Sequence, residues 1–244
     1  MKTETEKVIT EKDENYFQAI GVIPGKVTFD VENNKANVNV QGKDYSLRYA
    51  PTKQGGKAWE ALKREVQKSN SSQLRLTVYP HLIHFPGKDK QHILSFQLVG
   101  FSAKPDYVHP AGLKDFEFKM MGLWQFIPVC RIPCISVFRN FSEQRLVFIK
   151  KWEAPKKVRF IKAQHIPLLW KDSPVLPFRF NPRLQKEEQG RRYFVMIKTR
   201  FLPGKDAFGF DSLLRVPTQE IPPFFKAGKQ MKAEALKIRN QAIT

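Results

Sequence analysis

The chain has 244 residues and a formal net charge of +19, with 41% hydrophobic and 27% charged residues. This composition allows a packed core and excludes a chain that is disordered throughout, and the absence of an apolar run of about 18 residues excludes a membrane-spanning helix. Because so large a charge usually serves a polyanionic partner, nucleic acid and an anionic membrane surface are the two candidates.

Residues 1–15 hold three lysines against five acidic residues and no apolar stretch. We expect an acidic disordered tail there, and neither a signal peptide nor a transit peptide. The two cysteines, Cys130 and Cys134, lie in an apolar stretch and are expected to be buried thiols in a reducing cytoplasm. A zinc site needs four ligands, and neither this pair nor His81 with His84 has the further ligands to complete one.

A first unit over residues 16–103 is predicted to hold five strands and one helix. Alternating apolar residues and turn signals place strands at 16–30, 36–40, 44–50, 74–79 and 92–101, with a helix at 57–68. The first strand is expected to bend near Pro24 and Gly25. The order of strand, strand, strand, helix, strand, strand resembles the OB-fold, a five-stranded and partly open barrel.

A linker over 104–114 is expected to lead to a second, basic unit over 115–221, and a basic tail follows over 222–244. Strands are predicted at 116–129, 134–139, 158–163, 177–180, 192–202 and 207–214, with helices at 142–151 and, in the tail, 233–239. Phe17 to Pro24 is similar to Phe118 to Pro128, since in both an aromatic residue is followed four positions later by glycine. This weak repeat favours duplication of one barrel. The predicted fold is therefore mainly β, with two OB-like five-stranded barrels in tandem and one or two short helices.

Positive charge is concentrated in the second unit, where fifteen Lys and Arg face four acidic residues between Arg145 and Arg200. Lysine neutralises phosphates and releases counterions, which gives affinity independent of sequence. Trp152, Phe160 and Trp170 lie among these charges, and aromatic rings between cations suit unpaired bases because every base has a face that stacks. The alternative is that the rings belong to the core and the cations to ordinary solvated surface.

The individual candidates for nucleic-acid binding are chosen by the face of the strand on which they lie or by their place in a loop. Arg192, Lys198 and Arg200 share one face of a predicted strand whose other face is apolar. In the first unit, Arg75 and Tyr79 are expected to face outward, and Phe85 to lie at an exposed loop tip beside Lys88. The predicted nucleic-acid-binding residues are Arg75, Tyr79, Phe85, Lys88, Lys150, Lys151, Trp152, Lys156, Lys157, Arg159, Lys162, Arg179, Arg183, Arg191, Arg192, Lys198 and Arg200.

The sequence predicts no catalytic residue, no cofactor and no metal site. It has no glycine-rich phosphate loop, and no cluster of acids suggests a two-metal nuclease. The function predicted is non-catalytic binding of single-stranded RNA or DNA. A subunit or adaptor of a larger ribonucleoprotein or replication assembly is the first alternative, and a nuclease is the second. A membrane surface is less favoured, because no strongly amphipathic basic helix stands out.

Several phrases also resemble a family of small basic proteins from cyanobacteria. They are Tyr16 to Pro24, Phe96 to Phe101, Gly122 to Arg131, Leu169 to Asp172 and Pro177 to Pro182. The likeness extends over most of residues 16–214. It implies a lineage, and it implies neither a function nor a site residue.

Overall fold

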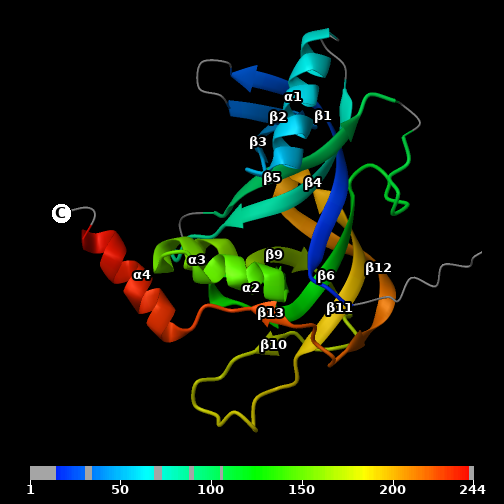
Figure 1. The fold of residues 1–244 in the computed structure, drawn as a ribbon. Helices are drawn as coiled ribbons and strands as arrows, with labels where there is room; N and C mark the ends of the chain where they lie inside the picture. The colour runs from blue at the N-terminus through cyan, green and yellow to red at the C-terminus, as the bar shows by residue number, and fades with distance from the viewer. Residues whose placement is uncertain (1–14, 31–34, 69–72, 88–90, 105–106, 242–244) are drawn as a thin grey trace, which may run out of the picture.

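The computed structural model describes residues 15–30, 35–68, 73–87, 91–104 and 107–241. Within these residues the protein is mainly β, with one eleven-stranded sheet, one two-stranded sheet and four α-helices (Figure 1). The mainly β class is confirmed. The expectation of one or two short helices is wrong, because α-helices occupy three segments beyond the first unit.

The first unit forms a closed five-stranded barrel. Its strands are β1 (Gln18–Asp30), β2 (Lys35–Val40), β3 (Lys43–Tyr49), β4 (Leu74–Ile83) and β5 (Ile93–Ser102). β1 pairs with β2 and β4, β2 pairs with β3, β4 pairs with β5, and β3 runs parallel to β5. The predicted order of elements is observed. The barrel closes because alternate residues, such as Ala36, Val38 and Val40 of β2, are buried inside it.

Helix α1 (Lys53–Lys68) covers this barrel and buries Trp59 and Leu62. It begins four residues before the predicted start. The hydroxyl of Thr52 accepts a hydrogen bond from the Gly55 N–H at 3.1 Å, which caps the first turn, so the glycine pair lies inside the helix.

A second group of strands consists of β6 (Glu117–Phe126), β7 (Cys134–Val137), β9 (Gln164–Leu169), β11 (Tyr193–Leu202) and β12 (Ala207–Thr218). β6 pairs with β7 and β11, β7 pairs with β9, and β11 pairs with β12. A short parallel pairing joins β12 to β9 at Phe208 and Gly209, so the pairings return to their starting strand. The short strand β10 (Phe178–Arg179) runs parallel to β6, and the 3-10 turns η1 (Pro128–Cys130) and η2 (Pro203–Lys205) complete the group.

The strand predicted at 158–163 is wrong, because the chain forms helix α3 (Ala154–Ile161) there. Ala154, Val158 and Ile161 follow helical spacing, and Pro155 lies in the first turn, where proline favours a helix start. Helix α2 (Glu143–Lys150) lies within its predicted range, and α4 (Lys229–Gln241) is longer than predicted. Between these segments, β8 (Arg139–Asn140) pairs with β13 (Phe224–Phe225).

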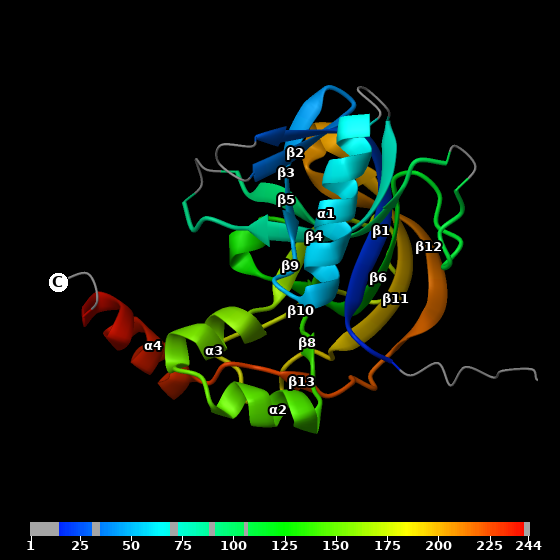
Figure 2. The same cartoon turned by 45° about the horizontal axis from the view of Figure 1, so that its top comes forward.

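Helices α2, α3 and α4 form a separate layer beside the second group of strands, which we call the helical layer (Figures 1 and 2). Ile149, Ile161 and Phe225 are buried at its centre, and Trp152 and Phe160 pack against them. The layer therefore has an apolar core of its own, contributed by all of its parts.

The two groups of strands are joined directly. β1 pairs with β6 from Gln18 to Gly21, and the Phe201 ring lies 5.4 Å from the Phe96 ring and 5.6 Å from the Tyr45 ring across the boundary. The predicted linker also packs on the first barrel, where Leu113 is buried. The groups consequently share one core.

Candidate nucleic-acid interface

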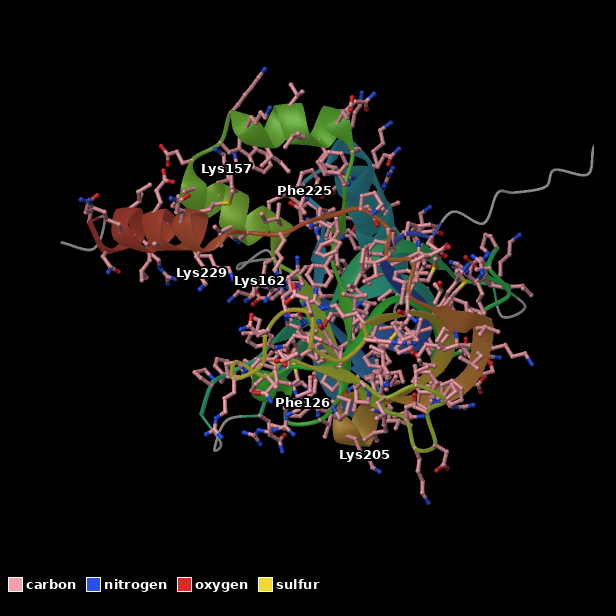
Figure 3. All side chains as sticks on the ribbon, turned by 90° about the horizontal axis from the view of Figure 1, so that it is seen from below. Phe126, Lys157, Lys162, Lys205, Phe225 and Lys229 are labelled. Atoms are coloured by element: carbon pink, nitrogen blue, oxygen red, sulfur yellow. The ribbon has the colours of Figure 1, made fainter. Side chains whose placement is uncertain are left out.

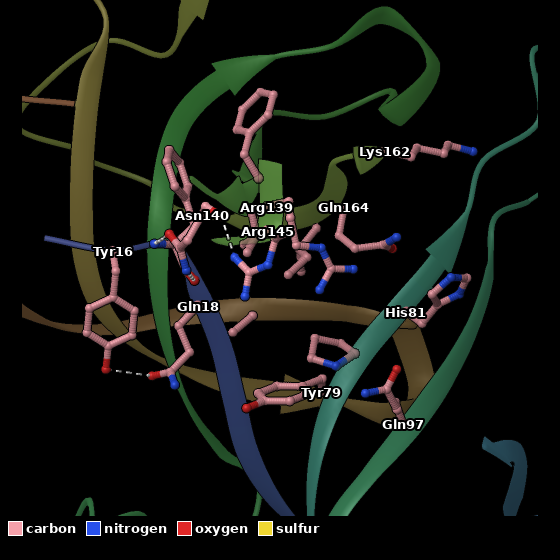
Figure 4. Close-up of a pocket in the computed structure, with 16 residues that line it drawn as sticks. Tyr16, Gln18, Tyr79, His81, Gln97, Arg139, Asn140, Arg145, Lys162 and Gln164 are labelled. Atoms are coloured by element: carbon pink, nitrogen blue, oxygen red, sulfur yellow. Dashed lines mark hydrogen bonds between the residues drawn. The ribbon is translucent and has the colours of Figure 1, made fainter. Parts of the chain in front are cut away.

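A cavity of about 330 Å³ opens where the first barrel meets the second group of strands and the helical layer. We call it the junction pocket (Figure 4). Its lining comes from β1, β4 and β5 on one side and from β7, β8, α2 and β9 on the other. The lining residues are Tyr16, Phe17, Gln18, Ala19, Tyr79, Pro80, His81, Gln97, Val137, Phe138, Arg139, Asn140, Arg145, Lys162, Gln164 and Ile166.

Strand β8 and the start of α2 position the two arginines of the pocket. Asn140 fixes this segment to the N-terminal strand, because its side chain accepts from the Phe17 N–H at 2.7 Å and donates to the Phe17 carbonyl at 2.9 Å. Ser142 caps α2 by accepting from the backbone N–H of Arg145. The Arg145 guanidinium then donates to the Asn140 carbonyl, while Arg139 lies with its guanidinium 4.5 Å from the centre of the Phe160 ring.

The junction pocket is electropositive. Arg139, Arg145 and Lys162 line it, and no Asp or Glu is among its lining residues. Arg139 is exposed at the rim, yet the atoms packed around its guanidinium lower its pKa by desolvation, and the charge of Arg145 lowers it further. Two like charges held together without a carboxylate favour the binding of an anion.

His81 and Tyr79 line the wall formed by β4. Burial lowers the pKa of His81, and the charges of Arg48 and Lys162 add to this effect, so the imidazole is neutral at pH 7. Its Nδ1 atom is buried without a hydrogen-bond partner among the described residues. Burial also raises the pKa of Tyr79, with a smaller contribution from Tyr16, so the Tyr79 hydroxyl keeps its proton.

Two of the predicted residues, Tyr79 and Lys162, line the junction pocket, and six others lie in the adjacent helical layer. These six are Lys150, Lys151, Trp152, Lys156, Lys157 and Arg159. Segments 143–162 and 226–241 together hold twelve Lys and Arg against three Glu. Figure 3 shows Lys157, Lys162 and Lys229 on one side of the molecule.

The aromatic residues of the basic stretch differ in accessibility. Trp152 is half-buried, with the Lys156 ammonium 4.6 Å above its ring and the Phe148 ring 5.0 Å away. Phe148 itself is 57% exposed and was not predicted. Trp170 is half-buried, stacks on Phe210 and packs against the shared core, so it is closer to the alternative interpretation than to an exposed platform for a base.

Other predicted cations lie elsewhere. Arg179, Arg183, Arg191 and Arg192 belong to β10 and the segment that leads to β11, where Arg179 and Arg192 lie over phenylalanine rings. Lys198 of β11 forms ion pairs with Glu117 at 3.4 Å and Asp211 at 3.1 Å, and Arg200 is exposed on the same strand. The predicted cationic face of β11 is cationic only at Lys198 and Arg200, because Phe194 and Met196, which lie on the same side of the strand, are buried in a second apolar cluster.

Two of the first-unit candidates, Arg75 and Phe85, lie against other parts of the protein. Arg75 forms an ion pair with Asp115 at 2.8 Å. Phe85 is half-buried, contrary to the predicted exposed tip, and lines a second cavity of about 290 Å³ together with His92 and Arg131. Lys88 lies outside the described residues.

Sequence reasoning did not select Arg139, Arg145, His81, Gln97 or Gln164 as site residues. A local signal existed for the arginines, since Ser142 is a helix cap and Arg139 and Arg145 flank it. No local signal marks the glutamines, because strand pairing alone brings them to the pocket.

Both cysteines are buried free thiols, as predicted. The Cys130 sulfur lies 3.7 Å from His84 Nε2. Among the described residues, no group of three or more His, Cys, Asp or Glu is arranged to hold a metal ion. Over the same residues, no helix combines the length and the apolar character needed to cross a membrane.

Neither a scan against protein-family models nor a search of curated proteins finds a match to this chain. The resemblance to basic cyanobacterial proteins stays a prediction. The function is therefore inferred from the junction pocket and the helical layer alone.

Proposed function

We propose that the protein is a non-catalytic nucleic-acid-binding protein that holds single strands of RNA or DNA across the junction pocket and the helical layer. One observation carries the proposal: three cations line the pocket, and no acidic residue is among its lining residues. Phosphate oxygens are the ligands that guanidinium and ammonium groups bind best, through charge-assisted hydrogen bonds. The ligand continues from the pocket along α3, because Lys162 directly follows that helix.

The helical layer extends the cationic surface. Lys150, Lys151, Lys156 and Arg159 are exposed, and none of them forms an ion pair with a described residue. Free cations on one surface neutralise successive phosphates and release counterions. A surface of this kind supplies affinity, and the pocket supplies a fixed position for one part of the strand.

In this proposal, a pair of OB-like barrels supports the binding surface. In both groups of strands the first strand pairs with the second and fourth, and the third runs parallel to the fifth. Gly21 and Gly122 hold corresponding places in the two first strands, and an added Cβ at either would collide with its surroundings. These parallels support a duplicated barrel. OB-folds bind oligonucleotides on the barrel surface.

Single strands are favoured over duplexes for two reasons. The pocket volume of about 330 Å³ is at the lower end for small-molecule sites, which suits one nucleotide unit. An exposed ring, Phe148, also lies in the cationic layer, and an unpaired base can stack on it.

The test is the salt dependence of binding to short single-stranded RNA and DNA, followed by fluorescence anisotropy. Arg139→Gln combined with Lys162→Ala is expected to weaken binding and to flatten the slope of log affinity against log salt by about 1.4, since each phosphate contact on a single strand contributes about 0.7. The control removes two exposed lysines of α1, Lys57→Ala with Lys68→Ala, since no residue of this helix lines the pocket. Unchanged binding by the pocket variant, or an equal loss in the control, would reject the proposal.

A further inference from the structure

The side-chain acceptors of the junction pocket are largely in use. Three of the four carboxamide oxygens that line it already accept hydrogen bonds from the protein: Asn140 Oδ1 from Phe17 N at 2.7 Å, Gln164 Oε1 from Leu82 N at 3.0 Å, and Gln18 Oε1 from the Tyr16 hydroxyl at 3.5 Å. The fourth carboxamide belongs to Gln97 of β5. Two of these donors are backbone N–H groups, which fix the orientation of the amides. The NH2 group of Gln164 consequently has no partner among the described residues and remains open to a ligand.

The donors of the pocket are in excess. A guanidinium carries five N–H groups and an ammonium three, whereas Arg139 uses one bond to the Phe160 carbonyl and Arg145 one bond to the Asn140 carbonyl. Figure 4 shows these two guanidiniums between Asn140 and Gln164, with the Lys162 ammonium farther along. No carboxylate lines the pocket to take up the spare donors.

We propose that the junction pocket selects uracil, thymine and guanine, which carry a carbonyl oxygen at position 4 of the pyrimidine or position 6 of the purine ring, over cytosine and adenine, which carry an amino group at that position. Beside the guanidiniums and the Gln164 amide, a carbonyl oxygen accepts a hydrogen bond, whereas an amino group there meets a second donor and leaves both groups unpaired. Lys162, which lies toward α3, is then left for the adjoining phosphate. This inference rests on the proposed nucleic-acid function and adds selectivity for the base.

Uridine and cytidine oligomers of equal length give the sharpest comparison. The two pyrimidines differ only at C4, which carries a carbonyl in uracil and an amino group in cytosine, and at the adjoining N3, which carries a proton only in uracil. Competition at fixed salt is expected to show tighter binding of the uridine oligomer, by about 5- to 150-fold for one discriminated base contact. The thymidine and deoxycytidine pair repeats the comparison without the 2′-hydroxyl.

Gln164→Glu replaces a hydrogen-bond donor of the pocket by an acceptor. The substitution keeps the oxygen that accepts from Leu82 N and replaces the open NH2 donor by an acceptor. The ratio of uridine to cytidine affinity is expected to fall toward one or to invert. Gln67→Glu on α1 makes the same charge change at an exposed position and is expected to leave the ratio unchanged. Thermal unfolding of both variants checks that each is folded.

The outcomes separate the two proposals. Equal affinity for uridine and cytidine with a normal salt slope would overturn base selection and leave nucleic-acid binding standing. A preference that survives both Gln164→Glu and Arg139→Gln would overturn the assignment of selection to this pocket. Absence of binding to every oligomer would overturn the proposed function and, with it, the selectivity.

Discussion

Gly21→Ala tests the close packing where β1 of the first barrel pairs with β6 of the second group of strands. Gly21 pairs with Val78 of β4 and with Phe118 of β6, and an added Cβ would overlap the Phe118 ring. That ring is fully buried and cannot withdraw, because the rings of Phe201 and Phe208 lie 6.3 and 4.9 Å from it. Overpacking of this kind costs about 1–3 kcal/mol. At about 2–4 °C per kcal/mol for a chain of this size, the melting temperature is expected to fall by about 2–12 °C.

The assay is thermal unfolding followed by circular dichroism, with Gly100→Ala as the control. Gly100 is also a strand glycine, but an added Cβ there meets nothing within 4 Å, so little change is expected. Phe118→Leu introduced beside Gly21→Ala is expected to recover part of the loss, since residues in contact are energetically coupled. An unchanged melting temperature in Gly21→Ala, or an equal fall in Gly100→Ala, would refute the close packing of Gly21 against Phe118. Two separate transitions in the wild type would refute the shared core.

Three further results are expected. Burial lowers the pKa of His81 below its ordinary value of 6.5, so the unfolded chain binds more protons than the folded chain just below that pH. The free energy of unfolding is therefore expected to decrease as the pH falls from 7 to 5. Urea titrations at several pH values measure this, and His81→Gln should show a weaker dependence of the unfolding free energy on pH. Phe148→Ala is expected to weaken single-strand binding about 5- to 150-fold at an unchanged salt slope. Val147→Ala, equally exposed on the same helix, is expected to leave binding unchanged. Asp206→Asn keeps an acceptor for the Tyr45 hydroxyl but loses the ion pair with Lys43, so the free energy of unfolding is expected to fall by only about 0–1 kcal/mol. Asp206→Ala removes one acceptor from the buried Tyr45 hydroxyl, and the same urea titration should show a loss of about 1–3 kcal/mol.

The first barrel was predictable because its signals are local. Ala36, Val38 and Val40 alternate with asparagines, and the chain turns at Gly42, which has a φ of 85°. β4 extends past the predicted end, through Pro80, for a reason that is not local. Its pairing with β1 ends at Val78, so Pro80 lies where β4 has only β5 as a paired neighbour and its missing N–H disrupts no second ladder.

The second group was harder to predict because short apolar runs fit a strand or a helix equally well. Val158, Phe160 and Ile161 were assigned to a strand, and the packing of α3 against α4 makes them helical. β9 was not predicted because it contains Pro167, and proline argues against a strand inside a sheet. In the structure Pro167 pairs with Cys134, the first residue of β7. The junction pocket combines residues separated by more than 140 positions, from Tyr16 to Ile166, and no window of sequence holds that information.

A net charge indicates a polyanionic partner, whereas the placement of the charge decides where that partner binds. Lys198 is neutralised by Glu117 and Asp211, and Arg75 by Asp115, so neither supports a continuous cationic groove. The segment between β7 and β9 contributes more. It forms β8, α2 and α3, and it supplies Arg139, Arg145 and Lys162 to the pocket and the helical layer beside it. The first barrel has no helices between its second and third strands, where a short turn connects them. The segment between the second and third strands of the second group therefore supplies the three cations of the pocket, and this distinguishes the second group from the first.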